Sequence, residues 1–114
     1  MEKSNFIWIK TQQEFIHNYP NAPVEVKFLR NLHRHMFHFK VYLEVKGNNR
    51  DVEFIMFKKD IEKYLSNLHT SIKSTSCEAL CDYIYEHIKN NYKGRAVKIE
   101  VSEDNENGVF KEYK

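Results

Sequence analysis

The stretch from residue 37 to 46 alternates between apolar and more polar side chains at every position, and it constrains the fold more than any other part of the chain. Successive side chains of a strand point to opposite faces of a sheet, so this pattern predicts a strand buried on one face. His38 falls on the more polar face. The apolar face carries Phe37, Phe39, Val41, Leu43 and Val45.

Other segments also indicate strands. Residues 6–15 carry Ile7 and Ile9 on one face and Phe6 and Trp8 on the other, which indicates a strand with both faces partly covered. Residues 97–103 alternate, and they are followed by a turn at "NENG" and a short final strand at "VFKEY". Asn and Pro predict a loop over residues 17–23, after which "VEVKFL" has extended character. The turn sequence "KGNN" precedes "RDVEFIM", whose Val52, Phe54 and Met56 share one face. We therefore expect "RDVEFIM" to pair with the long strand as a hairpin.

Two segments have the 3.6-residue periodicity of helices. The first begins at Phe57, ends near Leu68 and precedes a polar loop, "HTSIKS". The second covers residues 75–94, where Thr75 and Glu78 have the spacing of a capping box and Gly94 is the expected stop. Its apolar stripe comprises Leu80, Tyr83, Ile84, His87 and Ile88. The element order predicts an α+β fold with helices on one face of a mainly antiparallel sheet.

Length and charge limit the function classes. The 114 residues suit a single domain spanning residues 1–114, and the net charge of +2 makes nucleic acid an unexpected partner. We predict no membrane span and no signal peptide, and hence a reduced, cytoplasmic protein. Three basic residues, Lys27, Arg30 and Arg34, could meet a phosphate-bearing ligand or RNA, although a solvated rim is the commoner role for such residues.

Three histidines form a candidate metal site. His33 and His35 share the face of Phe37, and a His-x-His pair on one strand can place two ring nitrogens on one metal ion. His17 is the leading candidate for a third ligand, because it has the same strand parity as Phe15 and Ile9. The alternative is that these rings only form hydrogen bonds to backbone at the edge of the sheet.

Glu103 continues the apolar row of Val97, Ile99 and Val101. Its carboxylate either bends into solvent or is held for a ligand that offers adjacent N–H groups. Cys77 and Cys81, four residues apart on a helix, are expected to be small apolar residues, and a zinc role would need a second pair nearby. For His69 we expect a surface loop position, and for His87 a place in the core.

Taken in order, the segments "EFIH", "NLHRH", "FIMFKKDIEKYL", "SCEALCDYIYEHI" and "IEVSEDNENGVFKEY" resemble 6-pyruvoyltetrahydropterin synthase and 6-carboxytetrahydropterin synthase. The resemblance covers about residues 6–113. It implies zinc held by His17, His33 and His35, with Arg34 where the family has glycine. It also implies that Glu103 anchors a pterin ring. Ser76 and Cys77 stand where the family's Pro-Thr-x-Glu-Asn motif contributes to substrate binding.

The resemblance further implies the tunnelling fold. In that fold an antiparallel four-stranded sheet carries two helices on one face, and the subunits join into oligomeric β-barrels. Active sites lie between subunits, so we expect a homo-hexamer of two stacked trimers.

Two departures concern the chemistry. Leu29 stands where the family has its catalytic cysteine, and His69 lies in "NLH" without the aspartate that accompanies the family's histidine. We therefore expect a divergent zinc-dependent protein acting on a pterin or purine-like ligand, with His69 moving protons. The alternatives are a non-catalytic pterin- or nucleotide-binding protein and an interaction module without a ligand.

Overall fold

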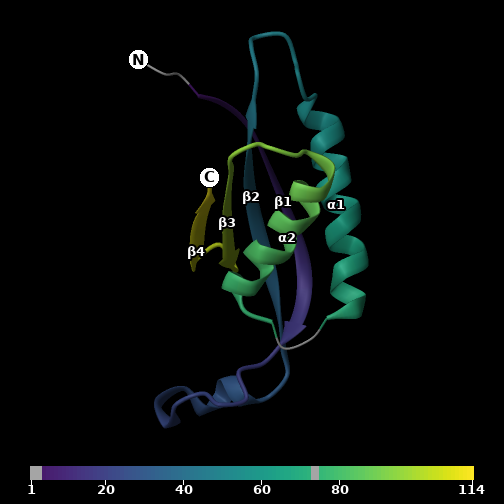
Figure 1. Cartoon of the computed structure of the whole chain (residues 1–114). Helices are drawn as coiled ribbons and strands as arrows, with labels where there is room; N and C mark the ends of the chain where they lie inside the picture. Colours follow the sequence, from purple (N-terminus) through teal and green to yellow (C-terminus); the bar gives the residue numbers. More distant parts are fainter. Residues whose placement is uncertain (1–3, 73–74) are drawn as a thin grey trace.

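The structure, a computed structural model, describes residues 4–72 and 75–114. Four strands and two α-helices follow one another in the order β1, β2, α1, α2, β3, β4, with a 3₁₀ helix, η1, between the first two strands (Figure 1). Their bounds are β1 Asn5–His17, η1 Val24–Arg30, β2 His33–Val45, α1 Phe54–Ser71, α2 Cys77–Asn91, β3 Val97–Glu103 and β4 Asn107–Tyr113.

The sheet is antiparallel throughout and its strand order is β1-β2-β3-β4. This confirms the α+β class and a four-stranded antiparallel sheet. The register pairs His17 with His33 at the last rung between β1 and β2, and it pairs Phe37 with Glu103 at the end of β3. The polar residues singled out in the sequence therefore gather at one end of the sheet.

The core lies between one face of the sheet and the two α-helices, which both lie on that side (Figure 1). Four of the alternating apolar residues of β2, Phe37, Phe39, Val41 and Leu43, are buried there as the pattern predicts, and Val45 at the end of the strand is only partly buried. Their partners are Phe57, Ile61 and Leu65 from α1 and Leu80, Cys81, Ile84 and Ile88 from α2. Among the described residues, none of the helices has the length and apolar character needed to cross a membrane.

The opposite face of the sheet carries aromatic rings and lysines instead of a helix. Lys40 lies over the rings of Trp8 and Tyr42, and Lys98 lies over Phe6. Trp8 is half exposed. Such cation–π contacts stabilise aromatic rings on a solvent-exposed surface, because the lysine ammonium groups cover part of each ring face.

The predicted hairpin partner is wrong. Residues 50–56 form no strand, because Glu53 caps a helix: its carboxylate accepts hydrogen bonds from the backbone N–H groups of Ile55 and Met56. Helix α1 thus begins at Phe54, three residues before the predicted start, and leaves Phe54 and Met56 exposed. Strand β2 is paired on its two sides by β1 and β3 instead.

The "VEVKFL" segment is helical instead of extended. Pro23 precedes the 3₁₀ helix, and the N–H of Val26 bonds to the Pro23 carbonyl at 3.0 Å. The guanidinium of Arg30 donates to the Ala22 carbonyl through Nε and Nη2, which closes the loop on itself. We call residues 18–32, which project from the end of the sheet, the arm (Figure 1).

The helix boundaries differ in smaller ways. Helix α1 continues to Ser71, so His69 lies on a helix and not in a loop; Lys73 and Ser74 of the predicted loop lie outside the described residues. The N-cap of α2 is Ser76 instead of Thr75, with the Ser76 hydroxyl accepting from the Ala79 N–H. Tyr83, placed in the apolar stripe from sequence, is 41% exposed.

Candidate metal centre

The three histidines come together at the end of the sheet, as their strand parity predicts. His17 ends β1, His33 begins β2, and His35 follows two residues later on the same face. Their ring centroids lie 4.4 Å (His17–His33), 4.9 Å (His33–His35) and 5.4 Å (His17–His35) apart. One nitrogen from each ring lies within 4.8 Å of the other two, so these residues could hold a metal ion.

Each ring is fixed by a hydrogen bond from its Nδ1 atom. The acceptors are the Thr75 carbonyl for His17 at 2.9 Å, the Asn31 carbonyl for His33 at 2.7 Å, and the Asp104 carboxylate for His35 at 2.6 Å. Carbonyl and ionised carboxylate oxygens only accept, so these partners place the proton on Nδ1. In the neutral ring Nε2 then keeps a lone pair, the form in which imidazole binds a metal.

The Nε2 atoms of His17 and His33 are buried, and within residues 4–72 and 75–114 neither has a hydrogen-bond partner. A buried polar atom without a partner costs roughly 1–3 kcal/mol. A metal ion among the rings removes that cost, and three imidazoles with outer hydrogen bonds are a donor set that suits Zn²⁺. The residues present therefore fit the zinc that the resemblance implies.

Two acidic residues adjoin the histidines from the end of β3. Glu103 is partly buried and faces the rings, with Oε1 3.6 Å from His17 Nε2 and Oε2 3.9 Å from His35 Nε2. Asp104 lies on the outer side, where the hydrogen bond from His35 holds the pKa of its carboxyl below the usual value. Of the two alternatives for Glu103, the structure places its carboxylate against the site instead of out in solvent.

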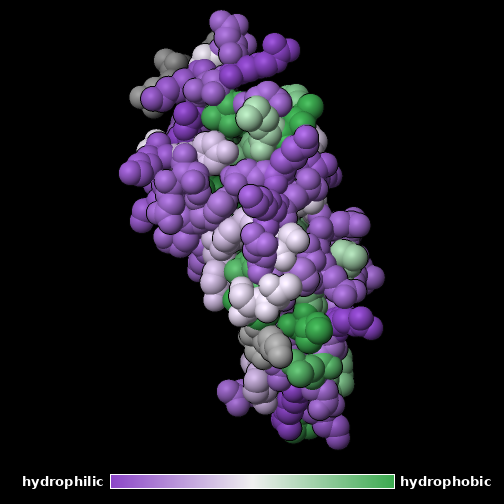
Figure 2. Space-filling view, turned by 90° about the vertical axis from the view of Figure 1, so that its right-hand side faces the viewer, coloured by the Kyte–Doolittle hydropathy of each residue, from purple (hydrophilic) through white to green (hydrophobic). Residues whose placement is uncertain are grey.

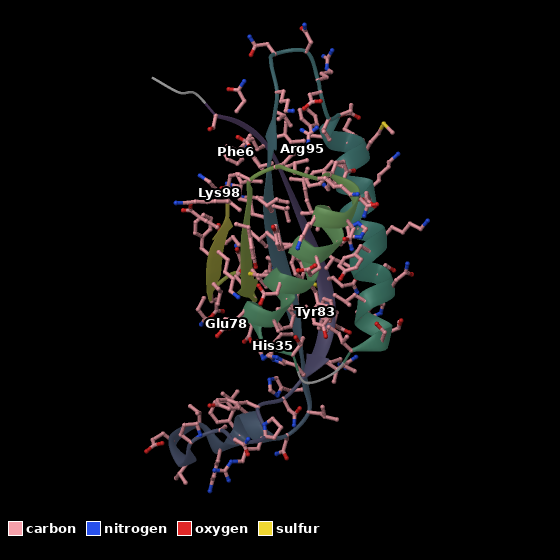
Figure 3. All side chains as sticks on the ribbon, in the orientation of Figure 1. Phe6, His35, Glu78, Tyr83, Arg95 and Lys98 are labelled. Atoms are coloured by element: carbon pink, nitrogen blue, oxygen red, sulfur yellow. The ribbon has the colours of Figure 1, made fainter. Side chains whose placement is uncertain are left out.

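A cleft of about 810 Å³ opens beside the histidines. His17, His33 and Glu103 line one side of it, and the start of α2 contributes Ser76 and Cys77. The arm contributes Leu29. His35, Glu78 and Tyr83 lie at this end of the molecule, far from Phe6 and Lys98 (Figure 3). The structure thus brings together every predicted metal and substrate residue.

His69 is the exception among the predicted site residues. It lies near the end of α1, where its Nδ1 meets the Ser66 carbonyl and its ring packs edge-on against Phe15. It is not among the described residues that line the cleft. A proton-transfer role for His69 would need a contact with the ligand that this arrangement does not supply.

Cys77 lines the cleft but is a poor nucleophile. Burial raises the pKa of its thiol to about 12, and the nearby Glu103 carboxylate adds to the rise. Burial likewise raises the pKa of Cys81 to about 11, and both thiols are free. Because the thiolate is the reactive form, neither residue is a ready nucleophile at neutral pH.

Sequence reasoning missed three residues that orient the rings, namely Asn31, Thr75 and Asp104. Asn31 and Thr75 act through backbone carbonyls, which leave no sequence signal. Asp104 follows Glu103 directly, and an acidic pair where a strand ends opposite a His-x-His strand could have indicated it.

No family model and no curated protein matches the chain. The functional conclusion therefore depends on the geometry of the metal centre and the cleft.

Proposed function

We propose that this chain is a divergent zinc-dependent protein, similar to 6-pyruvoyl- and 6-carboxytetrahydropterin synthases, that acts on a pterin or related purine-like ligand. The observation that carries the proposal is the convergence of three anchored imidazoles beside a cleft that His17, His33 and Glu103 line. Tunnelling-fold topology belongs to this proposal, and the four-stranded antiparallel sheet with both helices on one face supports it.

In this proposal each group of site residues has a different role. Zinc held by His17, His33 and His35 would polarise oxygen atoms on the ligand's side chain. Glu103 would accept two hydrogen bonds from adjacent N–H groups of the ring. Ser76 and Cys77 would shape the ring-binding wall at the start of α2.

A non-catalytic binding protein is the second candidate, and one observation favours it. Leu29 lines the cleft where the family has a thiol, and the Cys77 thiol stays protonated at neutral pH. A pocket with ligand-binding groups but no thiolate supports binding without the synthase reaction.

Assembly into a homo-hexamer completes the proposal. A ligand cleft at the end of the sheet, next to an exposed arm, suits a site that neighbouring subunits finish. The free edges of β1 and β4 would pair between subunits instead of staying open. Two free cysteines agree with a reduced, cytoplasmic setting.

Metal content and ligand binding test the proposal together. Elemental analysis of untagged protein should find about one zinc per chain. Calorimetry against neopterin, biopterin and guanosine nucleotides should detect binding of at least one compound by the wild type. Glu103→Gln should weaken that binding by roughly 2–4 kcal/mol, because the amide turns a donor toward ring donors.

The matched control is Glu100→Gln, which makes the same change on the exposed face of the same strand. It should bind ligand as the wild type does. Turnover of dihydroneopterin triphosphate would establish a synthase, and binding without turnover would establish the second candidate. Protein without metal that binds no compound of the panel would contradict both and favour an interaction module.

A further inference from the structure

The inner side of the histidine cluster has one feature that the three-ligand zinc site does not explain. Glu103 Oε1 faces His17 Nε2 at 3.6 Å, and Oε2 faces His35 Nε2 at 3.9 Å. Both separations exceed hydrogen-bond length. Because Nδ1 of each ring holds the proton, lone pairs of the carboxylate face lone pairs of the imidazoles. Two sets of lone pairs pointing at a shared space indicate a cation between them.

The separations also match ligands that share one metal ion. Zinc lies about 2.0–2.1 Å from nitrogen and oxygen ligands, so two ligands of a tetrahedral ion are roughly 3.3 Å apart. The two Glu103 distances exceed this value by a few tenths of an ångström. Glu103 is partly exposed, so rotation about its side-chain bonds can bring one oxygen within ligand distance of an ion held by the three histidines.

Asp104 does not compete for that corner. Its Oδ2 accepts from the outer nitrogen of His35 at 2.6 Å, and its Oδ1 accepts from the Met36 N–H at 3.3 Å. Both oxygens are therefore held on the side of the ring that faces away from the cluster. Two consecutive carboxylates thus approach His35 from opposite sides, Asp104 on Nδ1 and Glu103 on Nε2.

We propose that Glu103 is the fourth ligand of the metal centre, which is then a closed three-histidine, one-glutamate site until a ring ligand binds. This inference rests on the proposed metal centre but adds a second role for Glu103. One carboxylate cannot at once bind the metal and accept two hydrogen bonds from a ring. Ligand entry would therefore draw Glu103 off the metal and open a coordination position for the ligand's own oxygen.

Cobalt(II) in place of zinc tests the ligand set directly, because its visible d–d absorption is intense in four-coordinate sites and weak in six-coordinate ones. Metal-free wild type, Glu103→Gln and Glu100→Gln are titrated with Co²⁺ alone, and zinc affinity is measured by competition with a chelator. We expect an intense band for wild type and Glu100→Gln. We expect a shifted band for Glu103→Gln, because water takes the place of the carboxylate, with zinc affinity lower by at least about tenfold, the smallest loss typical of removing even an outer-shell partner.

Three results would overturn the inference. An unchanged band and unchanged affinity in Glu103→Gln would show that Glu103 is not a ligand, while leaving the three-histidine centre standing. Lower affinity with an unchanged band would show that the carboxylate acts through its charge alone. Absence of any cobalt band in folded wild type, with folding verified by circular dichroism, would remove the metal centre and this inference with it.

Discussion

At the scale of single residues, Asp104 contacts the candidate metal centre only through the outer nitrogen of His35. Its carboxylate fixes the ring orientation and makes Nε2 a better donor, an effect known for carboxylates behind metal-bound imidazoles. We predict that Asp104→Asn lowers zinc affinity by about 10- to 100-fold. Chelator competition would measure the loss.

The matched control for Asp104→Asn is Asp82→Asn, the same substitution on α2, where the carboxylate meets β4 instead of the histidines. This control should keep the zinc affinity of the wild type. Equal affinity in Asp104→Asn and wild type would show that the hydrogen bond to His35 does not support metal binding.

The two cysteines allow a second prediction at this scale. With the pKa of Cys77 near 12 and that of Cys81 near 11, almost no thiolate exists at about pH 8. Iodoacetamide should therefore leave both residues unmodified in the native protein and modify both rapidly in urea. Mass spectrometry after timed quenching would follow the reaction. Fast native alkylation of Cys77 would restore it as a candidate nucleophile.

At the scale of elements, Asp82 ties α2 to β4. Its carboxylate accepts from the Tyr113 hydroxyl at 2.6 Å and from Lys111 Nζ at 3.1 Å, and these hydrogen bonds hold the Asp82 pKa below its usual value. A lowered folded-state pKa stabilises the fold above the unfolded value of about 3.9 and loses that contribution as pH falls through the folded value.

We predict that Asp82→Asn lowers the free energy of unfolding at neutral pH by roughly 0.5–1 kcal/mol, a modest value because the exposed carboxylate is screened by solvent. The difference should shrink as the pH falls below about 3.9. Urea unfolding of wild type and variant at both pH values would measure it. A difference that stays constant with pH would assign the loss to something other than the charge of Asp82.

The elements also show what sequence can and cannot predict here. Strict alternation specified the buried face of β2, and the same parity placed His17, His33 and His35 together. The hairpin prediction was wrong at Val52, Phe54 and Met56. Three apolar residues at every second position are compatible with either a strand or the start of a helix. The Glu53 cap and the pairing of β2 by β1 and β3 decide between them, and neither is visible in the pattern.

The site shows the same limit. Side-chain ligands leave a spacing signal, so the three histidines and Glu103 could be predicted as site residues. The Thr75 and Asn31 carbonyls that orient the rings are backbone atoms, and their positions depend on where α2 begins and where the arm ends. Sequence therefore predicts the ligands of this centre better than the groups that hold them.

At the scale of the whole molecule, the arm is an exposed apolar projection. Val24 is 72% exposed and Phe28 is 67% exposed, and the side chains of Leu32 and Tyr19 are also largely exposed. Figure 2 shows hydrophobic surface toward the lower end of the molecule, the end from which the arm extends in Figure 1. Exposed apolar projections of this kind often mark protein contacts, so in the proposed hexamer we expect the arm to contact a neighbouring subunit.

We predict that Phe28→Asp breaks the assembly, because it would bury a charge in the subunit contact. Sedimentation at micromolar concentration should find a hexamer for wild type and smaller species for the variant. Met56→Asp, a similar change at an exposed position on α1, should leave the assembly intact. A wild-type monomer would contradict the expected oligomer, and a hexameric Phe28→Asp would exclude the arm from the contact.

The rung that joins His17 to His33 stands at the base of the arm, where a two-stranded ladder would otherwise fray. A metal ion bound to both residues would cross-link that rung and close the arm into a loop, as a covalent staple would. Amide hydrogen exchange near the rung should then slow on metal binding, while exchange at the Asn5–Val45 end stays unchanged. The proposed metal centre would in this way also determine how rigidly the arm is held for contact with a neighbouring subunit.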